Sequence, residues 1–265
     1  MKTDKKLYSL IKLCVLTLIC LATMGFQSMT QADESEWKFG IGTGFFALNI
    51  DGEIGLNLTT LGLGGQQFDV DLSADDTMDL METAIGFGGY ATNGSWLIDY
   101  GFNYLELVDT ISNDIVERGE FTVEVTGFEI LVGYPVFKTP NIVISLHGGA
   151  RYVRHELTSD ITASGTRAIE TIDEDWIDAL FGVSANIPLS DKWMWSNKFN
   201  AGFGGSEGTY QGFTGLNWQF HKSWSAGVYG RFTAVEFENG HKGDQDWYFY
   251  DADEYGAGIN IFYHF

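Results

Sequence analysis

Histidine is the side chain best suited to acid–base chemistry near neutral pH, and one of the five histidines has polar neighbours at a useful spacing. Ser145, His147 and Arg151 are separated by even numbers of residues, so an extended strand would place all three on one face. If Asp99 or Glu129 oriented the imidazole, the set could act as a Ser/His/acid hydrolase. The alternative is a group of polar side chains that only hydrogen-bond one another. No recognisable catalytic motif surrounds them, so we expect no enzyme and keep a hydrolase as the weaker alternative.

Acidic residues gather in the segments between the apolar stretches, which raises the question of a metal site. The Ca²⁺-binding loop pattern with its central glycine is absent, and no other set has convincing metal-ligand spacing. We therefore expect no metal centre and no cofactor. These segments are solvated loops, or they form a rim that concentrates divalent cations or screens solutes by charge. Their carboxylates are Asp69, Asp71, Asp75, Asp76 and Asp79; Asp109, Asp114, Glu117 and Glu120; Asp160, Glu170, Asp173, Glu174 and Asp175; and Asp244, Asp246, Asp251, Asp253 and Glu254.

The overall charge excludes one class of partner. The 265 residues include 15 Lys and Arg against 36 Asp and Glu, which gives a formal charge of −21 and a pI near 4.3. Nucleic acid binding needs a basic face, so we expect no nucleic acid partner. Aromatic residues reach 15%, which excludes disorder for most of the chain. The 33 glycines and only 3 prolines suit strands that pack closely.

The start of the chain has the composition of a secretory signal peptide. Four lysines surround the beginning of an apolar stretch, and small residues suited to cleavage end at Ala32. The alternative is an N-terminal membrane anchor. We expect a signal peptide over residues 1–32 and a single domain over residues 33–265. Both cysteines, Cys14 and Cys20, fall inside the predicted signal, so the processed domain would have no disulfide.

Beyond residue 32 the apolar residues recur at every second position, which predicts strands rather than helices. One face of each predicted strand is apolar and rich in aromatics, and the other mixes glycine with polar and charged residues. A transmembrane barrel needs an apolar face toward lipid and small or polar side chains in a narrow lumen. We therefore predict an all-β fold, a transmembrane antiparallel up-and-down β-barrel. A secreted sandwich or a soluble barrel is the alternative.

Ten strands are predicted, joined by connections that mostly alternate between tight and long. The strands cover residues 37–50, 78–91, 96–109, 121–137, 141–157, 173–188, 192–206, 209–220, 223–236 and 249–265. Tight turns on one side and long loops on the other are typical of membrane barrels with an even number of strands. A missed pairing would make eight strands, and a further hairpin inside the loop over residues 51–77 would make twelve.

Two groups of residues follow from the alternation of faces. Aromatic residues at the tight-turn ends of strands would form an interfacial girdle: Trp37, Trp96, Tyr134, Trp193, Trp195, Trp218, Trp224 and Phe265. Inward-facing polar residues would form a charge network that braces and largely closes the lumen: Lys38, Glu82, Asp99, Glu129, His147, Arg151, Asp178, Lys198, Arg231 and Glu254. Within it, we expect Arg151 to pair with Glu129 or Asp178.

Three stretches carry a resemblance to known proteins. The ending Tyr263-His264-Phe265, after alternating apolar residues, resembles the C-terminal assembly signal of bacterial outer-membrane β-barrel proteins. Residues 176–183 and 204–213 resemble a small, largely uncharacterised family of such barrels. OmpW and the OmpA transmembrane domain are similar in architecture only.

This resemblance implies a location in the outer membrane of a Gram-negative bacterium. The implied partners are outer-membrane lipid and lipopolysaccharide, the barrel assembly machinery through the C-terminal strand, and divalent cations at the acidic loops. The expected function is a structural or interaction role, with a mostly plugged lumen and acidic extracellular loops. The alternative is a narrow, porin-like channel or a binder for a small solute or cation.

Overall fold

The computed structural model describes residues 36–58, 63–111, 116–163, 165–244 and 246–265. The predicted signal peptide, with both cysteines, lies outside the described residues. Within them, no helix is long and apolar enough to cross a membrane.

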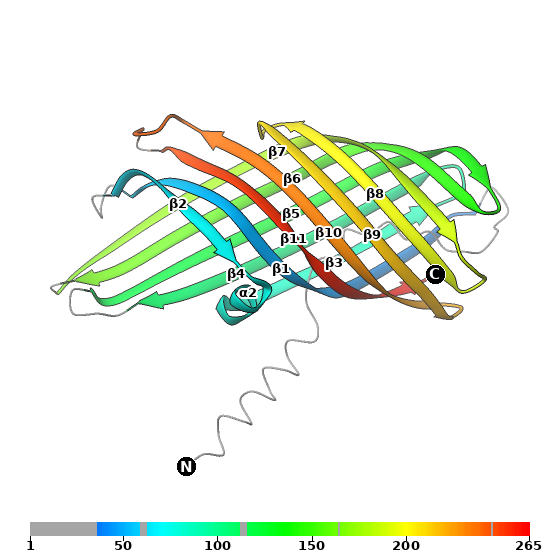
Figure 1. Ribbon diagram of the computed structural model, residues 1–265, viewed down its shortest axis with the longest axis horizontal. Coiled ribbons are helices and arrows are strands. Elements are labelled where there is room, and N and C mark those ends of the chain that lie inside the picture. The colour runs from blue at the N-terminus through cyan, green and yellow to red at the C-terminus, as the bar shows by residue number, and fades with distance from the viewer. Residues whose placement is uncertain (1–35, 59–62, 112–115, 164, 245) are drawn as a thin grey trace, which may run out of the picture.

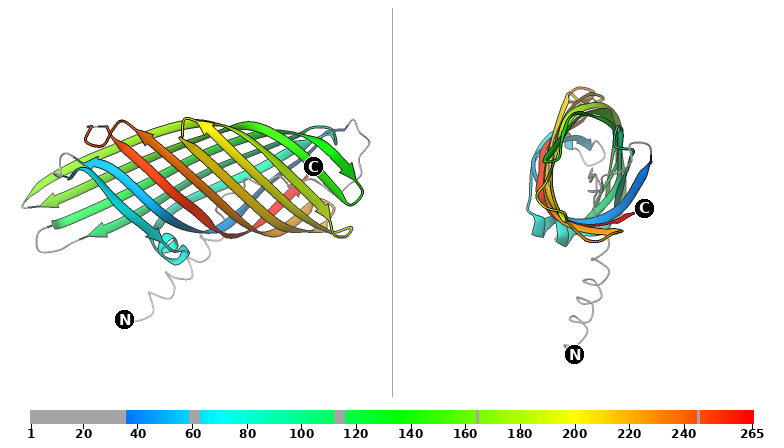
Figure 2. Two further views of the ribbon diagram at one scale, coloured as in Figure 1. Left: turned by 45° about the horizontal axis from the view of Figure 1, so that its top comes forward. Right: turned by 90° about the vertical axis from the view of Figure 1, so that its right-hand side faces the viewer.

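Eleven strands and one short helix make up the described part of the chain. They are β1 (Lys38–Leu58), β2 (Leu63–Leu72), α2 (Ala74–Leu80), β3 (Met81–Thr92), β4 (Leu97–Ile111), β5 (Val116–Thr139), β6 (Ile142–Ala163), β7 (Thr166–Pro188), β8 (Trp193–Gly204), β9 (Gly208–His221), β10 (Trp224–Asn239) and β11 (Tyr248–His264). Neighbouring strands are antiparallel, and β11 pairs with β1, so β1 and β3 to β11 close into a barrel of ten strands (Figure 2). The predicted all-β antiparallel barrel is confirmed.

The additional strand, β2, lies in the segment predicted as a long loop, over residues 51–77. In the described chain it pairs with the distal half of β1 alone and then leads into α2. Ser73 and Asp76 form a capping box that fixes the start of this helix. The predicted strand over residues 78–91 was therefore wrong at its beginning, because residues 78–80 complete the helix. The further hairpin extends the wall beyond the ring and leaves the barrel at ten strands.

The outer face of the barrel is apolar over a continuous belt. Ile130, Ile177 and Ile259 are 39%, 60% and 59% exposed. Many other large apolar side chains on this face are exposed as well. A soluble protein hides side chains of this kind, whereas in a bilayer the lipid covers them. The belt ends on β6 and β7 where Arg154 and Asp173 occupy outward positions and form an ion pair with an N–O distance of 2.7 Å.

One half of the wall is much taller than the other. β5, β6 and β7 have 24, 22 and 23 residues, whereas β8 and β9 have 12 and 14. Figure 1 shows these green strands running past the ends of their neighbours on the side of the long connections. Ion pairs such as that of Arg167 with Asp160 stabilise the outer surface of this part. The longer strands therefore form a projecting distal extension beyond the apolar belt.

Candidate functional site: the barrel lumen

An ion pair between Lys198 and Glu129 crosses the lumen. Nζ of Lys198 on β8 lies 3.7 Å from Oε1 of Glu129 on β5. Both residues are buried, with 8% and 3% of their surface exposed. Because β6 and β7 separate these strands in the ring, the two side chains meet inside the barrel and not along one ladder. Each charge thus neutralises the other in surroundings with little water.

Arg151 does not form the ion pair that we expected. The register is as predicted, because Arg151 lies opposite Glu129 on one side and opposite Asp178 on the other. Its guanidinium instead donates a hydrogen bond to the hydroxyl of Thr209 on β9. Opposed side chains on neighbouring strands project side by side, so a long arginine reaches past both neighbours to a strand farther round the barrel.

Asp178 holds the tight connection between β8 and β9. Its side chain is fully buried, and Oδ1 accepts hydrogen bonds of 2.8 Å from both the backbone N–H and the hydroxyl of Ser206. The connection passes through Gly204, whose φ of +139° favours glycine. Asp178 is therefore a turn anchor, a role that the predicted charge network did not include.

His147 belongs to a chain of amide side chains and not to a catalytic triad. Its Nε2 is hydrogen-bonded to Oδ1 of Asn200, and Nδ2 of Asn200 donates to Oε1 of Gln211 at 2.9 Å. Gly182 leaves room for this contact, since a Cβ there would collide with both His147 and Asn200. The buried hydroxyl of Ser145 has no hydrogen-bond partner among the described residues. The Ser/His/acid arrangement that the spacing allowed is not assembled.

An aromatic layer crosses the lumen nearer the long connections. Nδ1 of His155 is hydrogen-bonded to the hydroxyl of Tyr248 at 2.8 Å. The His155 ring makes edge contacts with Trp176 and Tyr250 at centroid distances of 4.9 and 4.8 Å, and Trp176 stacks on Phe237 at 4.3 Å. Sequence reasoning missed this layer. The available signal was that His155 is four residues after Arg151 and so shares its inward face.

A third set of contacts fills the lumen at the tight-turn end. Both ring nitrogens of His264 on β11 are occupied, Nδ1 by the hydroxyl of Tyr90 on β3 and Nε2 by the hydroxyl of Ser225 on β10, each at 2.8 Å. Since β11 closes the barrel against β1, this histidine ties together strands on both sides of the closure. The neighbouring inward residue Phe262 is completely buried.

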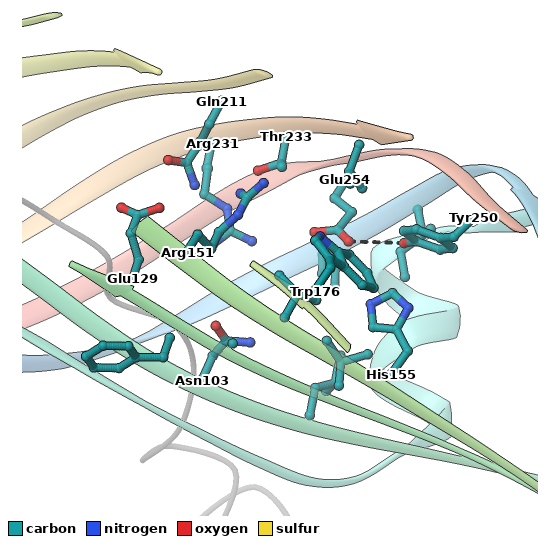
Figure 3. Close-up of a pocket in the computed structure, with 18 residues that line it drawn as sticks. Asn103, Glu129, Arg151, His155, Trp176, Gln211, Arg231, Thr233, Tyr250 and Glu254 are labelled. Atoms are coloured by element: carbon teal, nitrogen blue, oxygen red, sulfur yellow. Dashed lines mark hydrogen bonds between the residues drawn. The ribbon is translucent and has the colours of Figure 1, made fainter. Parts of the chain in front are cut away.

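A cavity of about 100 Å³ lies between the ion pair and the aromatic layer (Figure 3). Arg151, Arg231 and Glu129 line its polar side, and Glu254 accepts a hydrogen bond from the Tyr250 hydroxyl at 3.0 Å. Within the described residues, Nε of both arginines and Oε2 of Glu129 are buried with no hydrogen-bond partner. The cavity therefore presents two free donors and one free acceptor to whatever occupies it.

The remaining predicted residues differ in where they lie. Glu82 is exposed beside a bulge in the β3–β4 pairing, so its prediction as a lumen residue was wrong, because the bulge shifts the alternation by one position. Asp99 is buried in the lumen, and Lys38 is half-buried near the start of β1.

No three His, Cys, Asp or Glu side chains in the described chain are placed to hold a metal ion. The aromatic residues predicted as a girdle are all exposed at the tight-turn ends: Trp37, Trp96, Tyr134, Trp193, Trp195, Trp218, Trp224 and Phe265.

Comparisons with known proteins match the fold but not the sequence. No protein-family model matches the chain, and no curated protein matches it. The outer-membrane protease OmpT from Escherichia coli is similar with a TM-score of 0.53 at 10% identity, over 90% of this chain and 100% of that one. The translocator domain of autotransporter NalP from Neisseria meningitidis gives a TM-score of 0.45 at 14% identity, over 89% and 90% of the two chains. The transport unit of autotransporter AIDA-I from Escherichia coli gives 0.41 at 9% identity, over 90% and 93%.

The orientation follows from the connections. In barrels of this type, short turns face the periplasm and long connections face the exterior, so the distal extension is extracellular. At 10% identity the similarity to OmpT is one of fold, and the apolar belt identifies the surface that lipid surrounds. The chain is therefore a bacterial outer-membrane β-barrel, located in the outer membrane.

Proposed function

We propose that the protein is a sealed outer-membrane barrel with a structural or interaction role, and not a general pore. The observation that carries this proposal is the Lys198–Glu129 ion pair, which spans the lumen between strands that are not neighbours. The contacts of His264 fill the periplasmic end, and those of His155 fill the extracellular end. A barrel of ten strands is close to the size at which side chains fill the interior.

The extracellular surface supports an interaction role because its charge is strongly one-sided. Carboxylates stand directly opposite one another in two rows across β2, β1, β11 and β10, and all are exposed. Like charges in such positions lower the stability of the fold. The same carboxylates give this surface a strong negative potential. Divalent cations shared with lipopolysaccharide are the partners that fit it. One row holds Asp69, Glu53, Asp251 and Glu236, and the other holds Asp71, Asp51 and Asp253.

Other partners follow from the same architecture. Lipid covers the apolar belt, and the barrel assembly machinery would engage β11, whose exposed face carries Tyr255, Ile259 and Ile261. The proposal includes no enzymatic activity, because His147 is hydrogen-bonded to Asn200 and, among the described residues, not to a nucleophile.

Solute permeation into proteoliposomes tests this proposal. Purified folded protein is reconstituted, and swelling is followed in solutions of small neutral sugars and of amino acids. We expect rates equal to those of protein-free liposomes, with a general porin as the positive control. Swelling that scales with the amount of folded protein would overturn the sealed-barrel proposal in favour of a channel.

One observation favours a second candidate function, the binding of a small solute. In the cavity, polar atoms of Arg151, Arg231 and Glu129 have no hydrogen-bond partner among the described residues, and a ligand could supply one. A sealed lumen and a ligand cavity are compatible if the ligand enters from the side.

A further inference from the structure

β1 changes partner along one of its two edges. Its other edge is paired with β11 from Gly40 to Leu56. On the edge that changes partner, β1 pairs with β3 over residues 38–42. It then pairs with β2, but only from Ile50 onward. Within the described chain, no backbone ladder joins residues 43–49 of β1 to β3. Every other neighbouring pair in the ring has at least ten paired positions, so this seam is the weak point of the wall.

The seam lies at membrane depth. Phe45, which belongs to the unpaired stretch, is opposite Ile259 on β11, and Ile259 is 59% exposed in the apolar belt. Across the seam, Phe87 on β3 is 42% exposed. Backbone groups at this depth have no water to bond, so non-paired backbone is tolerated only where protein covers it or where it lines a cavity. In the described part of the chain, the hydroxyl of Thr43 bridges the seam by donating a hydrogen bond to the carbonyl of Gly86 at 2.7 Å.

α2 covers the extracellular end of the seam. The helix lies between the end of β2 and the start of β3, and it packs against β1 and β4. The side-chain oxygen of Asn49 on β1 accepts from the backbone N–H of Ala74 at 2.9 Å. Leu72, Leu80 and Met81, at the two ends of the helix, pack against the buried cluster inside the barrel. The closure is thus a seven-residue helix, which the described residues hold against β1 by the Asn49–Ala74 hydrogen bond and by a few apolar contacts.

Behind this closure lies the lumen cavity. Leu48 and Leu105 belong both to the cluster on which α2 packs and to the wall of the cavity. Ile50 and Val125 also line the cavity and pack against that cluster. The side of the cavity that faces the seam is therefore apolar, and the far side carries the charged groups shown in Figure 3.

The polar side would accept a head group that both accepts and donates hydrogen bonds. Nε of Arg151 and of Arg231 need an acceptor, and Oε2 of Glu129 needs a donor. A protonated carboxylic acid offers both, because its carbonyl oxygen accepts from the arginine N–H groups and its hydroxyl donates to Glu129. The volume of about 100 Å³ is similar to the ~150 Å³ of an engineered cavity that binds benzene, so a head group and a few methylenes fit.

We propose that the β1–β3 seam is a lateral entrance from the outer leaflet, closed by α2, and that the cavity binds the carboxyl head of a single-chain amphiphile whose tail lies in the seam. Entry requires displacement of Leu80 and Met81 from the apolar cluster and needs no axial opening of the lumen. This proposal goes beyond the sealed-barrel function, and the swelling assay does not decide it.

The test is photolabelling of the full protein in nanodiscs. The probe is a ten-carbon carboxylic acid with a diazirine near its head, and labelled residues are mapped by mass spectrometry. We expect labelling of the cavity walls at Leu48 or Val125, reduced at least tenfold by excess decanoic acid. The methyl ester of the probe should label only the outer belt. Labelling confined to outward residues such as Ile259 would overturn the proposal.

Two engineered disulfides distinguish a block of entry through the seam from a general effect of making the protein more rigid. Asn49→Cys with Ala74→Cys ties α2 to β1, and Thr158→Cys with Thr171→Cys joins two opposed positions in the distal extension. Oxidation of the first pair should slow cavity labelling at least tenfold, and reduction should restore it. The second pair should have no effect. Equal labelling in the oxidised seam variant would contradict the lateral entrance.

A pair of head-group variants tests the ligand class. Arg231→Gln should weaken cavity labelling at least tenfold, and Arg231→Lys should weaken it less. Arg154→Gln, outside the lumen, is the matched control and should label as the wild type does. Heat-modifiability on gels confirms that each variant is folded. Unchanged labelling of a folded Arg231→Gln protein would overturn the carboxyl assignment.

Discussion

Lys198 on β8 and Glu129 on β5 meet inside the barrel, with 3.7 Å between Nζ and Oε1, although two strands separate them in the ring. In the sealed barrel that we propose, a solute moving along the axis would have to displace this buried pair. We therefore expect the stability of the barrel to depend on the contact.

Lys198→Met should lower the free energy of unfolding by roughly 3–5 kcal/mol, because Glu129 would remain buried without a counter-charge. The urea midpoint of tryptophan fluorescence measures the change. Combining the substitution with Glu129→Gln should recover much of the loss. Arg154→Gln, at an exposed ion pair, should change the midpoint little. A loss as large in the double variant as in the single one would show that the cost does not come from an unpaired charge.

Gly182→Ala should destabilise the barrel by about 1–3 kcal/mol, because the new methyl group would collide with the backbone carbonyl of Phe199 and with the side chains of Asn200 and His147. Gly212→Ala is the matched control, since nothing lies within 4 Å of the position of its Cβ. Heat-modifiability on gels and the urea midpoint report the difference. Equal stability of the two variants would mean that the lumen is looser around His147 than its contacts indicate.

His264→Ala should weaken the closure of the barrel. The change leaves the hydroxyls of Tyr90 and Ser225 without their partner, at a cost of about 1–3 kcal/mol. His221→Ala, at the exposed end of β9, removes a histidine without opening the lumen. The unfolding rate in urea should rise for the first variant and stay constant for the second. A constant rate in both would remove His264 from the closure.

The distal extension should loosen in acid. Arg167 holds the pKa of Asp160 below its ordinary value through a hydrogen bond, and Arg154 does the same for Asp173. A carboxyl whose folded pKa is depressed stabilises the fold above its unfolded pKa of 3.8, and that stability is lost as the pH falls toward the folded pKa. Hydrogen exchange of β6 and β7, corrected for intrinsic rates, should therefore accelerate below about pH 4. Asp173→Asn should reduce this pH dependence, and an unchanged profile would contradict the assignment.

Asp251→Asn should raise the unfolding midpoint slightly at low ionic strength. The substitution removes a charge that stands between Glu53 and Glu236 in an acidic row. Salt screens exposed charges, so the gain should disappear at high salt. Asp191→Asn, in an exposed periplasmic turn, is the control. A gain that persists at high salt would point to a cause other than repulsion.

The barrel could be predicted because lipid imposes a strict alternation on the outer face. The periplasmic ends were placed well: the predicted strand over residues 141–157 begins one residue before β6 does. Its extracellular end was six residues short, because both faces become polar once the strand leaves the bilayer. The same loss of pattern hid β2, and the helix at residues 74–80 is too short to show a period of its own.

The sequence could predict which residues face the lumen, but not which of their side chains contact one another. Parity placed Glu129, Arg151 and Lys198 on one inward face, and the structure has all three in the lumen. The partner of each depends on how far its side chain reaches across a curved wall, which parity does not determine. The register alone suggested Arg151 as the ion-pair partner of Glu129. The partner is instead Lys198, whose flexible side chain reaches Glu129 from β8.

Single-channel recording in a planar bilayer tests the sealed lumen most directly. Folded wild-type protein, with its heat-modifiability verified, is inserted under the conditions in which a general porin gives clear steps. The sealed barrel predicts no discrete conductance steps above the protein-free baseline at any applied voltage that the bilayer tolerates. Stable, ohmic steps from the folded wild-type protein would show an open axial path and contradict the account.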